Sequence, residues 1–251
     1  MRDLIVIKVG TGVLTRENGT LDGASLVRLV TAVADLTNRG QRCLLVSSGA
    51  VGAGVSALGL EAYPQEVPAR QAAAAVGQAR LMQTYHALFK QFELNPAQLL
   101  LAGGDLSGSR KRVKRTIDHL LEHGGIIPII NENDSVAVEE LRVGDNDLLS
   151  AKVAELMEAK SLILLTTVDG LLDEENQTIP EVDSVAEVDH LARDESGKFS
   201  IGGMASKLKA VKFATDRGIE VLIANGRQPE QLSELVKGEG VRTRFKARVS
   251  E

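Results

Sequence analysis

Leu4-Ile-Val-Ile-Lys-Val9, an apolar and β-branched run that stops at a glycine, predicts a buried strand near the start of the chain. Apolar residues then recur at three- and four-residue spacing from Asp22 or Gly23, which indicates a helix that ends at Gly40. Residues 43–46 form a second apolar run. A strand, a helix and a strand in this order make a βαβ unit, so we expect the two strands to be parallel.

The same alternation continues along the rest of the chain. Further helices are predicted at 69–92, 110–123, 145–159 and 204–217, and further strands at 98–102, 126–131, 162–167 and 221–224. Strands that alternate with helices predict an α/β protein, a three-layer αβα sandwich around a central, mainly parallel sheet. No internal repeat and no Pro- or Ser-rich linker divides the sequence, so we expect a single domain over residues 1–251.

The composition narrows the class of protein. Hydrophobic residues make up 43% and aromatic residues only 3%, so the core is expected to be aliphatic. The 29 basic and 34 acidic residues give a net charge of −5, which offers no basic field for nucleic acid or an acidic membrane. Because the sequence has neither a long apolar run nor the charge order of a signal peptide, we expect a cytoplasmic protein. Cys43, inside an apolar run, is expected to be a buried, inert thiol.

Three glycine-bearing loops carry the first chemical signal, since ligands of open α/β sheets bind beyond the strand ends. Lys8 lies inside the first apolar strand, where a buried ammonium needs either a structural carboxylate partner or a bound anion. Gly10 and Gly12 follow it and allow close approach of a phosphate. A second loop, Ser48-Gly-Ala-Val-Gly52, and a third, Ile201-Gly-Gly-Met-Ala-Ser-Lys207 at a helix start, could add amides and a lysine. Together the three loops predict a polyphosphate site.

Two further runs, Asn131-Glu-Asn-Asp134 and Gly144-Asp-Asn-Asp147, are dense in amides and carboxylates. Such residues are common in turns for local hydrogen-bond reasons. They could equally form a pocket for an ammonium group or a metal ion, because the first run directly follows an apolar strand. Neither run has the spacing of a calcium-binding EF-hand loop.

Other motifs are weaker. His119-Leu-Leu-Glu-His123 matches an inverted zinc-protease pattern, but it lies in the last turn of a predicted helix, where histidines suit the dipole. Gly52-Ala-Gly-Val-Ser-Ala57 fits a dinucleotide fingerprint only by chance, and no P-loop motif exists. The basic run at 110–115 is interpreted as a solvated helix face, since no aromatic residues interleave for base stacking.

The motifs together resemble the amino acid kinase family, and within it the glutamate 5-kinase branch. Val6-Ile-Lys-Val-Gly-Thr-Gly-Val-Leu-Thr15 is similar to the first phosphate loop of that family, and Val46-Ser-Ser-Gly-Ala50 to the second. Ile130-Asn-Glu-Asn-Asp-Ser-Val136, followed by Val143-Gly-Asp-Asn-Asp-Leu148, is the paired signature of that branch. Gly202-Gly-Met-Ala-Ser-Lys207 resembles the nucleotide-side loop. The resemblance covers nearly the whole chain, with the motifs in the expected order.

The resemblance implies transfer of a phosphoryl group from ATP, with Mg²⁺, to the side-chain carboxylate of L-glutamate. It implies that Lys8 and Lys207 contact the phosphates and that Asp147 orients the two lysines. The glutamate would be held by Ser48, Gly49, Asn131, Asp134 and Asn146. The nucleotide and its phosphates would be bound by Lys8 and Lys207 together with Gly10, Thr11, Gly12, Thr166, Thr167, Asp169, Ile201, Gly202, Gly203, Met204, Ala205 and Ser206. No protein side chain is assigned as a metal ligand.

The resemblance also implies that residues 1–155 bind glutamate and that residues 156–251 bind the nucleotide. It implies a homo-oligomer, a dimer or a tetramer, with proline as a feedback inhibitor, and a kinase domain without the C-terminal PUA domain of many bacterial members. Three residues depart from the family pattern on the nucleotide side. Thr167 stands where many relatives have Asp, Leu172 where an aromatic is common, and Ile201 where a small or hydroxyl residue is usual.

Two other functions remain open at this point. One is a kinase of the same fold for another acceptor, such as acetylglutamate, which the paired Asn- and Asp-rich signature argues against. The other is a non-catalytic, nucleotide-binding regulator, in which Lys8, Lys207 and Asp147 would be expendable. In either kinase, the acceptor carboxylate is already ionised at neutral pH, so no general base is needed.

Overall fold

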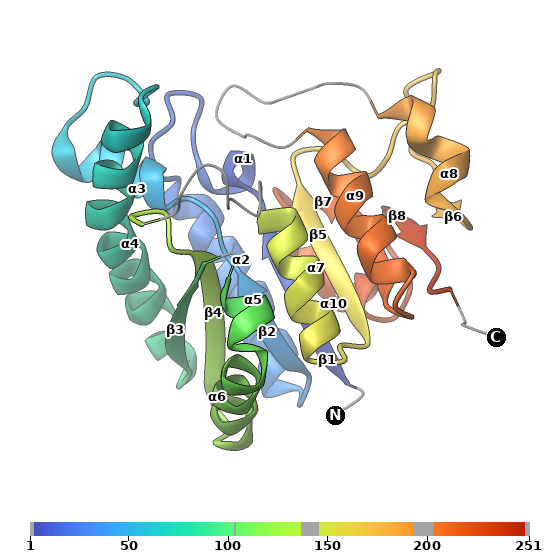
Figure 1. Cartoon of the computed structure of the whole chain (residues 1–251), viewed down its shortest axis with the longest axis horizontal. Helices are drawn as coiled ribbons and strands as arrows, with labels where there is room; N and C mark the ends of the chain where they lie inside the picture. Colours follow the sequence, from blue (N-terminus) through green and yellow to red (C-terminus); the bar gives the residue numbers. More distant parts are fainter. Residues whose placement is uncertain (1–2, 103, 137–145, 193–202, 249–251) are drawn as a thin grey trace.

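The computed structural model describes residues 3–102, 104–136, 146–192 and 203–248, and these form an eight-stranded sheet. The strand order is β3-β4-β2-β1-β5-β7-β8-β6 (Figure 1). The strands are β1 Leu4–Val9, β2 Arg42–Val46, β3 Asn95–Leu101, β4 Ile126–Glu132, β5 Ser161–Thr166, β6 Glu181–Val182, β7 Glu220–Asn225 and β8 Arg242–Phe245. Neighbours are parallel except β7 and β8, which confirms the predicted, mainly parallel sheet.

Helices cover both faces of the sheet and give the predicted three layers. One face packs against α1 Thr11–Leu14, α2 Gly23–Asn38, α3 Ala50–Leu58, α4 Val67–Phe89 and α10 Leu232–Leu235. The other packs against α5 Asp105–Gly108, α6 Arg110–Glu122, α7 Asn146–Leu156, α8 Val185–Val188 and α9 Met204–Thr215. Short 3₁₀ turns lie at Lys90–Phe92, Asp189–Leu191 and Pro229–Gln231. In Figure 1, α7 and α9 cross the front of the sheet while α2 lies behind it.

The pleat of β1 decides which helices its side chains meet. Ile5, Ile7 and Val9 point into the core beneath α2, while Leu4 and Val6 point into the core beneath α7 and α9. Because successive side chains alternate between faces, Lys8 follows Leu4 and Val6 toward α7 and α9. The side chain of Lys8 therefore points into the otherwise aliphatic core between β1 and the helices α7 and α9.

Several elements differ from the sequence-based boundaries. The predicted glycine loop at 48–52 contains the start of α3, and α4 begins two residues before the predicted helix at 69–92. β3 begins at Asn95 rather than at residue 98, and its Pro96 is tolerated because β3 is the edge strand. The strand β8 was not predicted, since Arg-Thr-Arg-Phe is too short and polar to be recognised as a strand.

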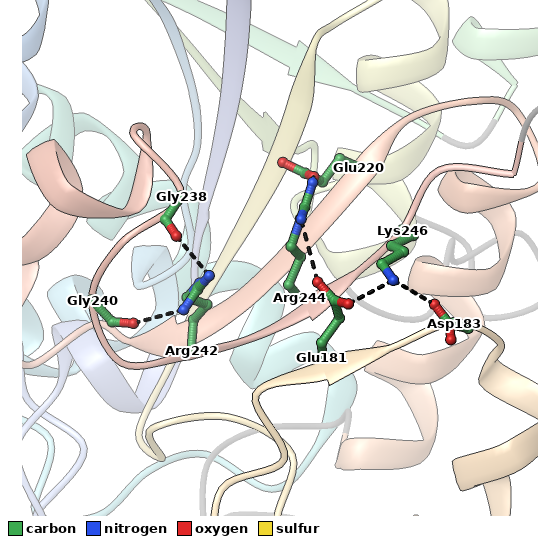
Figure 2. Close-up of polar contacts among 8 residues, drawn as sticks. All are labelled: Glu181, Asp183, Glu220, Gly238, Gly240, Arg242, Arg244 and Lys246. Carbon is green, nitrogen blue, oxygen red and sulfur yellow. Dashed lines mark hydrogen bonds and ion pairs between the residues drawn. The ribbon is translucent and has the colours of Figure 1, made fainter.

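Ion pairs attach the polar strand β8 to its neighbours (Figure 2). Arg244 contacts Glu220 of β7 at 2.5 Å and Glu181 of β6 at 3.3 Å, and Lys246 contacts Glu181 at 2.6 Å and Asp183 at 2.8 Å. The hydrogen bond from Lys246 and its charge hold the pKa of the Glu181 carboxyl below its ordinary value. The charged side chains thus bridge β8 to the strands on both sides of it, while Phe245 is buried in the core.

Cys43 is buried in β2 and forms no disulfide, and burial raises the pKa of its thiol to about 12. The prediction of a buried, inert thiol is therefore confirmed, because the reactive species is the thiolate. Among the helices of the described residues, none combines the length and apolar character needed to cross a bilayer.

The helices α3 and α4 pack backbone to backbone through glycines. A Cβ atom on Gly54 would lie 1.9 Å from the carbonyl oxygen of Ala73, and one on Gly77 would lie 1.8 Å from that of Ala50. Neither obstacle is a flexible side chain. Gly54 of the apparent dinucleotide fingerprint thus serves helix packing, and together with Gly77 it fixes α3 against α4.

We expect Gly54→Ala to destabilise the protein by more than about 2 kcal/mol, because the two helices must separate to admit one methyl group. The matched control is Gly23→Ala in the first turn of α2, where a Cβ would meet nothing within 4 Å. That change should be neutral or slightly stabilising, since alanine lowers the entropy of the unfolded chain. Urea unfolding followed by circular dichroism measures both, and equal stabilities would contradict the close packing.

Candidate functional site

The candidate site lies where the carboxyl ends of β1, β2, β4 and β5 meet, at the top of the sheet in Figure 1. Their parallel direction brings the predicted loops to one edge although they are far apart in sequence. β1 lies at the middle of this set, paired with β2 on one side and β5 on the other.

The centre of the site is a buried group of three charges. Lys8 Nζ lies 2.5 Å from Oδ1 of Asp147, and Lys207 Nζ lies 3.2 Å from Oδ2 of the same carboxylate. The side chains of Lys8, Lys207 and Asp147 are 3%, 10% and 0% exposed. The structure thus brings together three residues from β1, α7 and α9, as the sequence predicted.

Two ammonium groups face one carboxylate within this group. Lys207 also lies in the first turn of α9, where the helix dipole disfavours a cation and favours an anion. Two lysines brought to one carboxylate at the carboxyl edge of a parallel sheet, one of them at a helix start, fit a site for an anion.

The first glycine loop contributes differently from the prediction. The amide of Gly10 donates to the carbonyl of Leu165 at 3.0 Å, so it serves the sheet and is not available to a phosphate. Thr11 and Gly12 begin α1, and the first amides of a helix have no partner within it. A Cβ on Gly12 would lie 3.0 Å from the methyl carbon of Thr167, so glycine lets this loop approach the end of β5.

The predicted glutamate-binding residues converge on Asn146, the first residue of α7. Its side-chain amide donates to the carbonyl of Ser47, to Oγ of Ser48 and to Oδ1 of Asn131, each at 3.0 Å. Gly49 caps α3 with φ +97°, a left-handed conformation that favours glycine. Loops after β2 and β4 and the start of α7 are thereby joined by one side chain.

The helix α4 borders this side of the site through Gln78, which accepts from the side-chain amide of Asn131 at 2.9 Å. In the segment before α4, burial raises the pKa of Tyr63 to about 12, and the charge of Asp134 adds to this rise while that of Arg70 opposes it. The sequence analysis missed Gln78, because an alanine-rich helix indicated packing only.

The predicted nucleotide-side residues lie across the sheet from this pocket. Thr166 ends β5, and its carbonyl accepts from the amide of Gly226 at 2.7 Å. Asp169 accepts from the side chain of Asn225 at 2.9 Å, a residue at the end of β7 that the sequence gave no reason to select. Gly203 caps α9, whose first turn holds Met204, Ala205 and Ser206. Ile201 and Gly202 lie outside the described residues.

The described residues contain no group of three His, Cys, Asp or Glu side chains that could hold a metal ion. Mg²⁺ in phosphoryl-transfer sites keeps several waters and binds substrate phosphates together with one or two carboxylates. A magnesium ion of that kind would be held mainly by phosphate oxygens and water and would need no cluster of three protein ligands.

The histidines and the basic run of α6 lie apart from the site. His119 contacts Glu122 at 3.6 Å, and its ring meets that of His123 with centroids 4.9 Å apart, close to the beginning of β4. Arg110 pairs with Glu155 of α7 at 2.6 Å.

Comparisons with known proteins agree with this geometry. Residues 3–225 match the model of the amino acid kinase family. A glutamate 5-kinase of Clostridium acetobutylicum is 43% identical over 250 residues, which cover 96% of this chain and 93% of that protein. A glutamate 5-kinase of Clostridium tetani is 42% identical, and one of Geobacter is 44% identical but is longer, with 67% of its length covered.

The fold is shared with a solved structure of much lower sequence similarity. Carbamate kinase from Giardia lamblia bound to AMP-PNP matches with a TM-score of 0.68 over 98% of this chain and 99% of that chain, at 17% identity. This match confirms the predicted carbamate kinase-like architecture.

We expect Asp147→Asn to lower the free energy of unfolding by about 3–5 kcal/mol, because it removes the buried carboxylate that both ammonium groups contact. The control is Asp35→Asn, which breaks an exposed pair with Arg39 (2.9 Å) and should cost less than about 1 kcal/mol. Urea denaturation of both variants measures the two changes in the free energy of unfolding. Equal, small effects would mean that Asp147 does not neutralise the lysines.

Proposed function

The chain belongs to the amino acid kinase family, and we propose that it transfers the γ-phosphoryl group of ATP to the side-chain carboxylate of L-glutamate. The product would be L-glutamyl 5-phosphate, the first intermediate of proline synthesis in this family. The identity of 42–44% to glutamate 5-kinases supports the acceptor. The observation that carries the chemistry is the buried group of Lys8, Asp147 and Lys207, in which two lysines meet one carboxylate.

The acceptor determines what the protein must supply. A glutamate side chain has a pKa of about 4.3, so it is an anionic nucleophile at neutral pH and needs no general base. The obstacle is the repulsion between that carboxylate and a triphosphate. Catalysis therefore consists of positioning the two anions in line and neutralising the charge that spreads over the transferring group.

The two lysines perform the neutralisation in this proposal. Lys8 projects from the rigid centre of the sheet, and Lys207 from the first turn of α9, so they approach a phosphoryl group from different elements. Asp147 holds both ammonium groups before the substrates bind. Such preorganisation avoids the cost of orienting the charges during the reaction.

The acceptor would lie against the pocket formed by Ser48, Asn131 and Asn146, which their mutual hydrogen bonds keep in place. The nucleotide would lie over the end of β5 and the start of α9. Mg²⁺ bound to the phosphates would supply further positive charge. Residues 1–155 thus serve the acceptor and residues 156–251 the nucleotide.

Three finer properties carried over from the resemblance are proposed with this function. Proline, which shares the α-amino-acid group of glutamate, would inhibit by competing for the glutamate pocket. The chain would form a homo-oligomer, and it would act in the cytoplasm.

The test is an acyl-phosphate assay with ATP and, in turn, L-glutamate, N-acetyl-L-glutamate and L-aspartate, each with and without proline. We expect phosphorylation of L-glutamate above the other acceptors and a rise in its KM with proline. Phosphorylation of acetylglutamate alone would assign the other kinase. Binding of ATP without transfer to any acceptor would assign a regulator.

We expect Lys8→Ala and Lys207→Ala each to lower kcat by at least about a hundredfold, as loss of one preorganised contact with a transition state often does. The matched control is Lys209→Ala, an exposed lysine in the same turn of α9, which should keep normal turnover. Near-normal kcat in either site variant would refute the assigned role of that lysine.

A further inference from the structure

A chain of side-chain amides runs from the exposed edge of the sheet to the acceptor pocket. Gln98 on β3 accepts from Nε2 of Gln78 on α4 at 2.9 Å, and Oε1 of Gln78 accepts from Nδ2 of Asn131 at 2.9 Å. Oδ1 of Asn131 then accepts from Nδ2 of Asn146 at 3.0 Å, and the same nitrogen donates to Oγ of Ser48. Each amide of the chain therefore donates toward the edge of the sheet.

Two backbone groups fix this direction. The main-chain N–H of Glu132 donates to Oδ1 of Asn131 at 2.9 Å, so a carbonyl oxygen is required there. The main-chain carbonyl of Ser47 accepts from Nδ2 of Asn146 at 3.0 Å, so an amide nitrogen is required there. Neither amide can be turned over without losing its backbone partner. Nδ2 of Asn131 then needs an acceptor, and Gln78 supplies it.

The same direction leaves one acceptor over. Oδ1 of Asn146 is buried and has no hydrogen-bond partner among the described residues. Buried polar atoms of folded proteins are nearly always paired, so an orphaned acceptor in a pocket indicates a donor that arrives with the ligand. An ammonium group is the donor that L-glutamate offers at neutral pH, since both of its carboxylates are ionised.

We propose that Gln78 is a positioning residue that keeps Oδ1 of Asn146 available to the ammonium group of the acceptor, and thereby favours amino acids over plain dicarboxylates. If Asn131 turned its Nδ2 toward Asn146, that oxygen would be used inside the protein. Asn131 is 2% exposed, so water cannot replace Gln78 as its acceptor. The inference rests on the proposed function, because it adds a residue behind the same acceptor pocket.

The test compares two substitutions of similar length. Gln78→Met replaces the amide with a thioether, which accepts only weakly, whereas Gln78→Glu keeps an oxygen for Asn131. Gln78→Met should raise the KM for L-glutamate about tenfold, as expected for one lost hydrogen bond, and change kcat and the KM for ATP less than threefold. Gln78→Glu should stay within threefold of the wild type, because the exposed amide of Gln98 can turn its nitrogen toward the new carboxylate.

A second measurement addresses the ammonium group itself. Glutarate keeps both carboxylates of glutamate and lacks the amino group. Gln78→Met should change kcat/KM for glutarate, or its inhibition constant against L-glutamate, less than threefold. The preference of the protein for L-glutamate over glutarate should therefore fall about tenfold, which a loss of packing alone would not produce.

The control is Gln83→Met, at an exposed position further along α4, which should change neither substrate. Thermal midpoints show whether each variant folds, and Gln78→Lys, which offers Asn131 a donor, should show the same loss if the methionine variant is unstable. An equal loss for L-glutamate and glutarate, or an equal loss in Gln78→Met and Gln78→Glu, would overturn the assignment. A wild-type protein that fails to phosphorylate L-glutamate would refute the proposed function instead.

Discussion

The arrangement of the whole site depends on the carboxylate of Asp147, which holds the ammonium groups of Lys8 and Lys207 in a place that water does not reach. Each of these residues would be unfavourable there alone, since a buried charge without a partner is costly. Together they are tolerated, because each ammonium group has an oxygen of the carboxylate beside it. This pairing constrains the fold, because three elements must meet at one point to maintain it.

The sheet provides that meeting point. The pleat of β1 turns Lys8 toward the face that α7 and α9 cover, and the packing of α7 on α9 places Asp147 and Lys207 over it. Asn146, the residue directly before Asp147, reaches the other half of the site. Its side-chain amide connects Ser48 and Asn131. Two adjacent residues at the start of α7 therefore fix the distance between the acceptor pocket and the lysines.

Much of this arrangement could be predicted from the sequence, because local signals coincide with it. A lysine in an apolar strand, glycines before a helix and two Asn- and Asp-rich runs each have a physical reason to be rare outside a site. The residues that were missed have no such local signal. Gln78 lies in an alanine-rich helix whose direction depends on the contact of Gly54 with Ala73, and a contact between two helices is not visible in the sequence of either one. Gly10 was placed in the phosphate loop, and its amide pairs with Leu165 of a strand more than 150 residues away, which no local pattern reveals.

The position of the lysines has a chemical consequence under the proposed function. Glutamate carries two carboxylates, and both are ionised at neutral pH. In that function the charges that neutralise the phosphoryl group belong to Lys8 and Lys207 on Asp147, whereas the side chains proposed to hold the amino acid, those of Ser48, Asn131 and Asn146, are uncharged. The carboxylate that reacts would then be the one that the pocket directs toward the lysines, so the regiochemistry would follow from position and would need no difference in reactivity between the two carboxylates.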